Sequence, residues 1–197
     1  MQTKTTQQIQ KNLSLAINSH GKLPSQVFLE NWVNFLFFDS DRAFVDDFAE
    51  KVQLLLKIEG GHCACIVDLD NDPNTRYHSF YFKKDTLPIE YQLVMAGSPM
   101  KADGWIYNFS SRYACISDVG DWCIYCKRCD ELAVIAFREH VAVEKYKVVI
   151  EQLKAVEISY GIATQHLFSL SEYASAEWRE SLLSSYQSTR SPYVIRD

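Results

Sequence analysis

The fold is decided by the stretch Tyr113-Ala-Cys-Ile-Ser-Asp-Val-Gly-Asp-Trp-Cys-Ile-Tyr-Cys-Lys-Arg-Cys-Asp-Glu-Leu-Ala-Val-Ile-Ala-Phe137. Three runs of β-branched, aromatic and Cys residues are separated here by short connections, at Asp118–Asp121 and at Arg128–Asp130. Such runs predict strands. The predicted strands cover residues 113–117, 122–127 and 132–137. Because both connections are short, the three strands are expected to form an antiparallel meander at the centre of the fold.

Further elements are expected on both sides of this meander. Strands are predicted at 62–68 and 77–82, and helices at 5–19, 27–38, 42–58, 143–160 and 175–187. The run 27–38 is dense in aromatic residues and short enough to be a buried helix or a strand, and the helix is the preferred assignment. Strands that cluster between terminal helices predict an α+β fold, with an antiparallel sheet packed against several helices.

Length and composition indicate one folded domain, residues 1–197. Hydrophobic residues make up 47% and charged residues 23% of the chain, which is typical of globular proteins. No apolar stretch reaches the roughly 18 residues that span a bilayer, and the polar start Met1–Lys11 has no signal-peptide pattern. We therefore expect a cytoplasmic protein that does not interact with membranes.

The charge pattern points to a basic partner. The net charge of −5 argues against nucleic acid, whose phosphates need concentrated Lys and Arg. Residues 39–72 contain nine acidic and three basic residues, a net charge of −6. The predicted partner-binding residues are the carboxylates on the outer face of helix 42–58 and in the following loop: Asp46, Asp47, Glu50, Asp68, Asp70 and Asp72. The alternative is an ordinary solvated helix face and loop.

The sequence offers one candidate metal site, Cys123-x2-Cys126-x2-Cys129. A structural zinc site needs four ligands, usually from two such knuckles, and only one is present. Alternation along the strand 122–127 also places Cys123 and Cys126 on opposite faces. The cysteines are therefore predicted to be free core thiols, with no metal or cofactor; a metal or redox site at these three cysteines is the alternative.

No other motif predicts a metal or catalytic site. Asp68-x-Asp70-x-Asp72 has the opening spacing of a calcium loop, but Pro73 and Ser79 stand where that loop needs Gly and Glu. Common short signatures of catalysis and phosphate binding are missing, and the five histidines are scattered singly. We expect no catalytic residues.

The run from Ser117 to Phe137 resembles a hairpin common in bacterial immunity proteins. In that hairpin a Gly-Asp-Trp strand is followed by a short charged turn and a strand of small apolar residues. Immunity proteins protect cells from polymorphic toxins, including those of contact-dependent growth inhibition. The resemblance implies a cytoplasmic, non-enzymatic antitoxin that binds one toxin domain stoichiometrically, for example a basic nuclease. The alternative function is a small intracellular enzyme or a metal or redox protein that uses the cysteine cluster.

Overall fold

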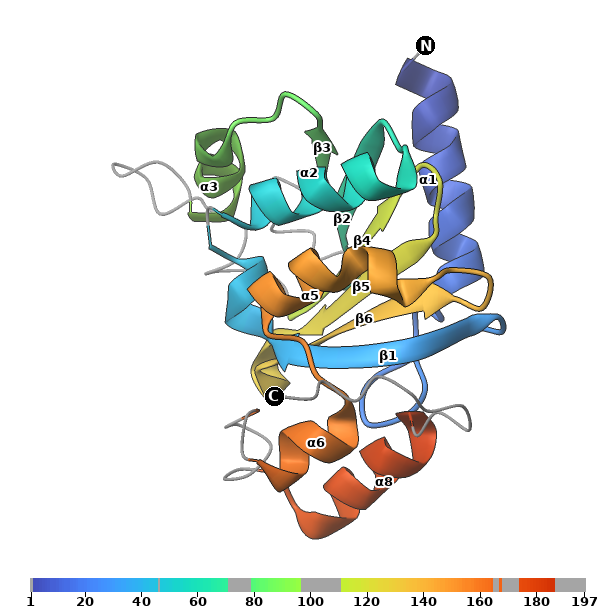
Figure 1. Ribbon diagram of the computed structural model, residues 1–197, viewed down its shortest axis with the longest axis vertical. Helices are drawn as coiled ribbons and strands as arrows, with labels where there is room; N and C mark the ends of the chain where they lie inside the picture. The colour runs from blue at the N-terminus through green and yellow to red at the C-terminus, as the bar shows by residue number, and fades with distance from the viewer. Residues whose placement is uncertain are drawn as a thin grey trace.

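A six-stranded antiparallel sheet organises the described part of the chain, with strand order β1-β6-β5-β4-β2-β3 (Figure 1). The computed structural model describes residues 2–45, 47–70, 79–96, 111–164, 167 and 174–186. The strands are β1 (Trp32–Asp39), β2 (Cys63–Asp68), β3 (Ser79–Lys83), β4 (Arg112–Ser117), β5 (Trp122–Lys127) and β6 (Leu132–Arg138). The α-helices are α1 (Gln2–Ala16), α2 (Phe48–Glu59), α3 (Pro88–Ala96), α5 (Lys147–Leu153), α6 (Ile158–Ala163) and α8 (Ala176–Tyr186). The 3-10 helices are η1 (Ser40–Ala43), η2 (Arg128–Asp130) and η3 (Val143–Tyr146). This is an α+β fold, as the sequence predicts.

The predicted meander forms the middle of the sheet. Strand β5 pairs with β4 on one side and β6 on the other, so that Ile124 lies opposite both Cys115 and Ile135. Almost every residue of these three strands is buried. The run that decides the fold is therefore also the centre of its core.

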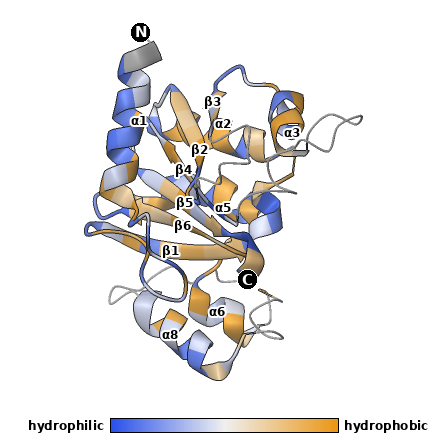
Figure 2. Ribbon diagram, turned by 180° about the vertical axis from the view of Figure 1, so that it is seen from behind, coloured by the Kyte–Doolittle hydropathy of each residue, from blue (hydrophilic) through white to orange (hydrophobic). Residues whose placement is uncertain are grey.

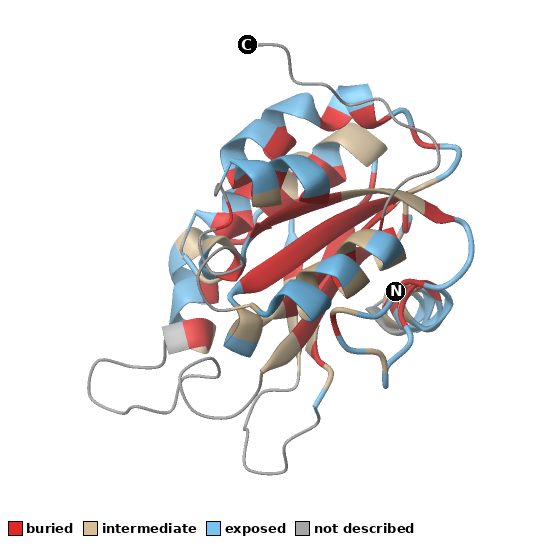
Figure 3. Cartoon of the chain, turned by 90° about the horizontal axis from the view of Figure 1, so that it is seen from below, coloured by how far each residue is buried: buried red, intermediate tan, exposed pale blue. Residues whose placement is uncertain are grey.

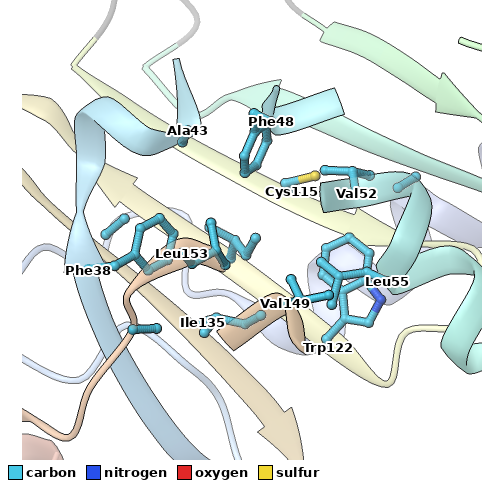
Figure 4. Packing of buried hydrophobic residues seen from close by; sticks show 14 of the residues in the cluster. Phe38, Ala43, Phe48, Val52, Leu55, Cys115, Trp122, Ile135, Val149 and Leu153 are labelled. Atoms are coloured by element: carbon cyan, nitrogen blue, oxygen red, sulfur yellow. The ribbon is translucent and has the colours of Figure 1, made fainter. Parts of the chain in front are cut away.

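Helices cover both faces of the sheet. One layer, here called the α2 layer, contains α2, α3, η3 and α5; the other, the α1 layer, contains α1, α6 and α8. Seen from below, the strands lie buried between helices whose outer faces are exposed (Figure 3). In the α2 layer Trp122 packs beside Leu55 and Val149 (Figure 4). Each buried apolar side chain of the central strands therefore enters one of two separate apolar clusters.

The assignment of residues 27–38 to a helix is wrong, because β1 occupies Trp32–Asp39 and pairs with β6. Its side chains alternate between the two clusters: Leu36 and Phe38 enter the α2 layer, and Phe37 enters the α1 layer. Since both faces are buried, the strand lacks the alternation of polar and apolar residues that would have identified it.

The predicted helix 143–160 is also wrong as a continuous element. It is interrupted at Lys154, which adopts a left-handed conformation with φ of 52°, and at Val156, which pairs with Phe37 at the edge of β1. Residues before this interruption pack in the α2 layer, whereas Ile158 packs in the α1 layer. The segment carries the chain around the edge of the sheet, which a straight helix could not do.

Helix α2 begins at Phe48, later than the predicted residue 42. Residues Ser40–Ala43 form η1 instead, because the Asp39 carboxylate accepts a hydrogen bond from the Asp41 N–H at 2.8 Å and caps a tight turn. The other predicted helices and strands occur with ends shifted by a few residues, and α3 was not predicted at all.

Helix α2 ends in a glycine motif. Gly60 is left-handed, with φ of 81°, and the N–H groups of Gly60 and Gly61 both bond to the Leu56 carbonyl. The Gly61 bond is the longer bond of a Schellman motif, and the Gly60 bond is that of an αL motif. This glycine motif turns the chain from the last helical residue, Glu59, directly into β2.

Candidate functional site

Two of the predicted partner-binding residues lie on the surface at the start of α2. Asp47 and Glu50 are both exposed. The Asp47 carboxylate lies 2.5 Å from the ammonium group of Lys51, whose side chain is buried. Much of the Asp47 charge is therefore balanced within the helix. Asp46 lies outside the described residues.

The acidic loop residues Asp68 and Asp70 make hydrogen bonds within the fold. Asp68 is only 1% exposed and accepts a hydrogen bond from the Asp70 N–H at 2.9 Å. Asp70 accepts bonds from the N–H groups of Ser111 and Arg112 and forms an ion pair with the Arg112 guanidinium at 2.5 Å. Asp70 thus ties the end of β2 to the start of β4, whereas the Asp68 carboxylate caps the turn that follows β2. Asp72 lies outside the described residues.

Helix α3 presents an apolar surface beside α2. Three large apolar side chains in or just before α3 are about half exposed: Leu87 at 58%, Ile89 at 52% and Leu93 at 48%. Helix α3 is one of the more hydrophobic helices (Figure 2). The helix is held against α2 by Gln53, whose amide donates to the carbonyl of Thr86. Glu50 is exposed one turn before Gln53, on the side of α2 that meets the segment leading into α3. The sequence pattern did not indicate α3, and this surface was therefore missed.

The cysteines do not converge. Cys123 belongs to the α1 layer and Cys126 to the α2 layer, while Cys129 is exposed in η2. This confirms the predicted alternation along β5. Within the described ranges no three His, Cys, Asp or Glu residues are grouped as metal ligands. Burial raises the pKa of the Cys123 and Cys126 thiols far above the ordinary range, which makes them poor nucleophiles.

A buried polar cluster lies where the end of α2 meets the β4–β5 turn. It contains the carboxyl group of Glu59, the indole N–H of Trp122 and the hydroxyl of Tyr146. All of these polar atoms are buried, and none has a hydrogen bond of good geometry with a described residue. Most buried polar groups in proteins are paired, so three unpaired ones at a single place mark an unusual environment.

The charge of Glu59 depends on this environment. Burial raises the pKa of Glu59 to about 7. The neighbouring Ser117 hydroxyl and Trp122 indole N–H oppose that rise, although neither meets the geometry of a full hydrogen bond, and the carboxylates of Asp121 and Asp118 add to it. Glu59 is consequently a buried carboxyl group that changes charge near neutral pH. No sequence motif surrounds it, and only its place before Gly60-Gly61 could have drawn attention to it.

The β4–β5 turn at this cluster is firmly anchored. Asp118 accepts a hydrogen bond from the His62 N–H at 3.0 Å, and Asp121 contacts His140 Nε2 at 3.1 Å. From α1, the Asn12 amide donates to the carbonyl groups of Ser117 and Asp118. The turn is thus a meeting point for segments that are distant in sequence.

Comparisons with known proteins give no relative: no family model, no curated protein and no solved structure matches the chain. No helix in the described ranges has the length and apolar character needed to cross a membrane.

Proposed function

We propose that the chain is an immunity protein, a non-enzymatic antitoxin that acts in the cytoplasm by binding one cognate toxin domain stoichiometrically. The starting point is the resemblance of the run Ser117–Phe137 to the hairpin of bacterial immunity proteins. In this chain that run forms β5 and β6 at the centre of the sheet. A buried hairpin supports the fold, so the partner must be bound elsewhere, on an exposed surface.

The observation that carries the proposal is the surface formed by Asp47, Glu50, Leu87, Ile89 and Leu93, here called the α2–α3 surface. Three large apolar side chains are about half exposed there, and exposed carboxylates of α2 border them. Apolar anchors with a charged border are the usual composition of a protein–protein interface. In such an interface the apolar side chains supply most of the affinity.

The carboxylates would act mainly on the rate of association. Glu50 is exposed in the first turn of α2, and the described residues include no ion pair for it. Exposed charges steer an oppositely charged partner and reject wrong ones, but add little to affinity. A basic toxin domain, such as a nuclease with a cationic substrate cleft, is the partner that fits this surface. Asp68 is buried and Asp70 is paired with Arg112, and neither is part of the proposed surface.

We expect a basic toxin domain to be encoded next to this chain, and the test uses that domain. The expected result is a one-to-one complex that abolishes toxicity. Replacing Ile89 and Leu93 by Ser should weaken binding at least about tenfold, since buried apolar anchors carry the energy of an interface. The matched control is Val148→Ser on α5, where Val148 is 54% exposed. It should bind like the parent.

A charge variant tests the second part of the proposal. Glu50→Lys should slow association and reduce its dependence on salt, whereas Glu180→Lys, at an exposed position of α8, should not. If the toxin is neutralised but neither α2–α3 variant differs from its control, the surface is misplaced. If no adjacent toxin domain binds at all, the immunity function itself is refuted.

A further inference from the structure

The carboxyl group of Glu59 lies in a place that disfavours negative charge. Glu59 is the last residue of α2, where the unpaired carbonyl groups give a helix the negative end of its dipole. Both of its oxygens are shielded from water. A carboxylate therefore lacks both solvation and a favourable field here, whereas a protonated carboxyl group needs neither.

The charged groups around Glu59 add to this effect. From the β4–β5 turn, Asp118 and Asp121 are both close enough to disfavour its ionisation, and Tyr146 from η3 adds only a neutral hydroxyl. No Lys or Arg among the described residues lowers its pKa. The nearby Arg138 is occupied elsewhere: it donates to the Gly120 carbonyl at 2.7 Å and lies over the Trp32 ring.

Three further titratable residues lie around the cluster: His140, His62 and Lys57. His140 reaches the cluster only through Asp121, and its ring is mostly exposed. His62 contributes its backbone N–H to Asp118. On α2 itself, Lys57 is exposed. The carboxyl group of Glu59 therefore faces two acids. The Lys145 ammonium group of η3 lies 5.5 Å from the centroid of the Tyr146 ring, but it is not among the groups that lower the pKa of Glu59.

Gly61 lies between the carboxyl groups of Glu59 and Asp118. A Cβ atom on Gly61 would lie 2.9 Å from Glu59 Oε1 and 3.0 Å from Asp118 Oδ1. The two carboxyl groups thus flank the same glycine, with no side chain between them. The Asp118 charge adds to the rise in the pKa of Glu59, because like charges repel, although burial contributes most.

We propose that this cluster is a proton-binding site: Glu59 carries a proton in the folded chain, and losing it releases the end of α2 from the β4–β5 turn. The proton passes from the carboxyl group to bulk water, and the resulting carboxylate must leave the cluster to be hydrated. Gly60 and Gly61 follow immediately and allow the last turn of the helix to open. The burial-raised pKa of about 7 places this step near neutral pH.

The test follows the parent chain by NMR between pH 5 and pH 9. The side-chain carboxyl carbon of Glu59 should titrate with a midpoint near 7, and the Trp122 indole proton should report the same midpoint. Hydrogen exchange at the Gly60 and Gly61 amides, corrected for the intrinsic effect of pH, should accelerate above it.

Variants identify the group that titrates. In Glu59→Gln, the neutral mimic of the acid, the Trp122 titration and the pH-dependent exchange should both be lost. The control His140→Gln removes the histidine next to Asp121 and should leave both unchanged, since histidine is the other side chain that titrates in this range. A Glu59 midpoint below 5.5, or a Trp122 titration that disappears only in His140→Gln, would overturn the proposal. The direct carboxyl measurement decides even if a variant fails to fold.

Discussion

Single side chains of the central strands are expected to contribute strongly to stability. Trp122 and Ile135 are both 0% exposed in the α2 layer. Replacing either by Ala should lower the free energy of unfolding by about 2–5 kcal/mol, because the cavity left in a packed core collapses only partly. Urea unfolding measures this. Val148→Ala, at an exposed position of α5, is the control and should stay within about 0.5 kcal/mol of the parent. If both core variants have the same free energy of unfolding as the parent, the meander does not form the core.

Glu59 should make the stability of the chain depend on pH. Its pKa is raised from 4.5 to about 7 on folding, so the folded state favours the protonated acid. This contribution is full below pH 4.5 and is lost as the pH rises through 7, by up to about 3 kcal/mol. Glu59→Gln should therefore match the parent near pH 4 and exceed its unfolding free energy at pH 8. A constant difference between the two proteins across that range would contradict the prediction.

On the scale of elements, the docking of α1 on the β4–β5 turn depends on one glycine. Gly120 and Gly60 share a φ of 81°, but a Cβ on Gly120 would lie 2.8 Å from Asn12 Nδ2, while one on Gly60 would meet nothing within 4 Å. Gly60→Ala should cost about 1 kcal/mol for the left-handed backbone alone. Gly120→Ala should cost at least about 1 kcal/mol more, since it also displaces the Asn12 amide.

Thermal or urea unfolding of both variants measures the difference. Adding Asn12→Ala to Gly120→Ala removes the steric conflict, so the two substitutions should be less than additive. Equal losses in Gly60→Ala and Gly120→Ala would show that the Asn12 contact does not constrain the turn.

A helix or strand can be predicted from the sequence when its pattern of apolar residues depends only on that element and its close neighbours in the chain. The meander was predictable because short turns force neighbouring strands together. Strand β1 was not, because both of its faces are buried and its partner β6 lies about a hundred residues away. The break at Lys154 was not predictable either, since it arises from the pairing of Val156 with Phe37.

The candidate sites also divide into those that local sequence determines and those that tertiary packing determines. Alternation within β5 was enough to separate Cys123 from Cys126. The role of Asp70 depends on groups at 111–112, and the Glu59 cluster is assembled from α2, β5 and η3. Such arrangements result from tertiary packing, which a single sequence does not display.

On the scale of the whole molecule, the two apolar layers should protect the thiols. All six cysteines are free, five are buried and Cys129 is exposed. A maleimide should therefore add rapidly to one site in the native protein and to six after denaturation, as counted by mass spectrometry. Cys129→Ser should abolish the rapid addition. Rapid native labelling at Cys123 or Cys126 would mean that the layers open readily.

The pairing of β1 with β6 has a consequence for synthesis on the ribosome. Residues 32–39 emerge early, yet their partner strand ends at Arg138, about a hundred residues later. Translation at roughly 5–20 residues per second leaves this aromatic segment without its partner for several seconds. During that interval it is a template for aggregation, and a nascent chain of this kind is a natural client for chaperones.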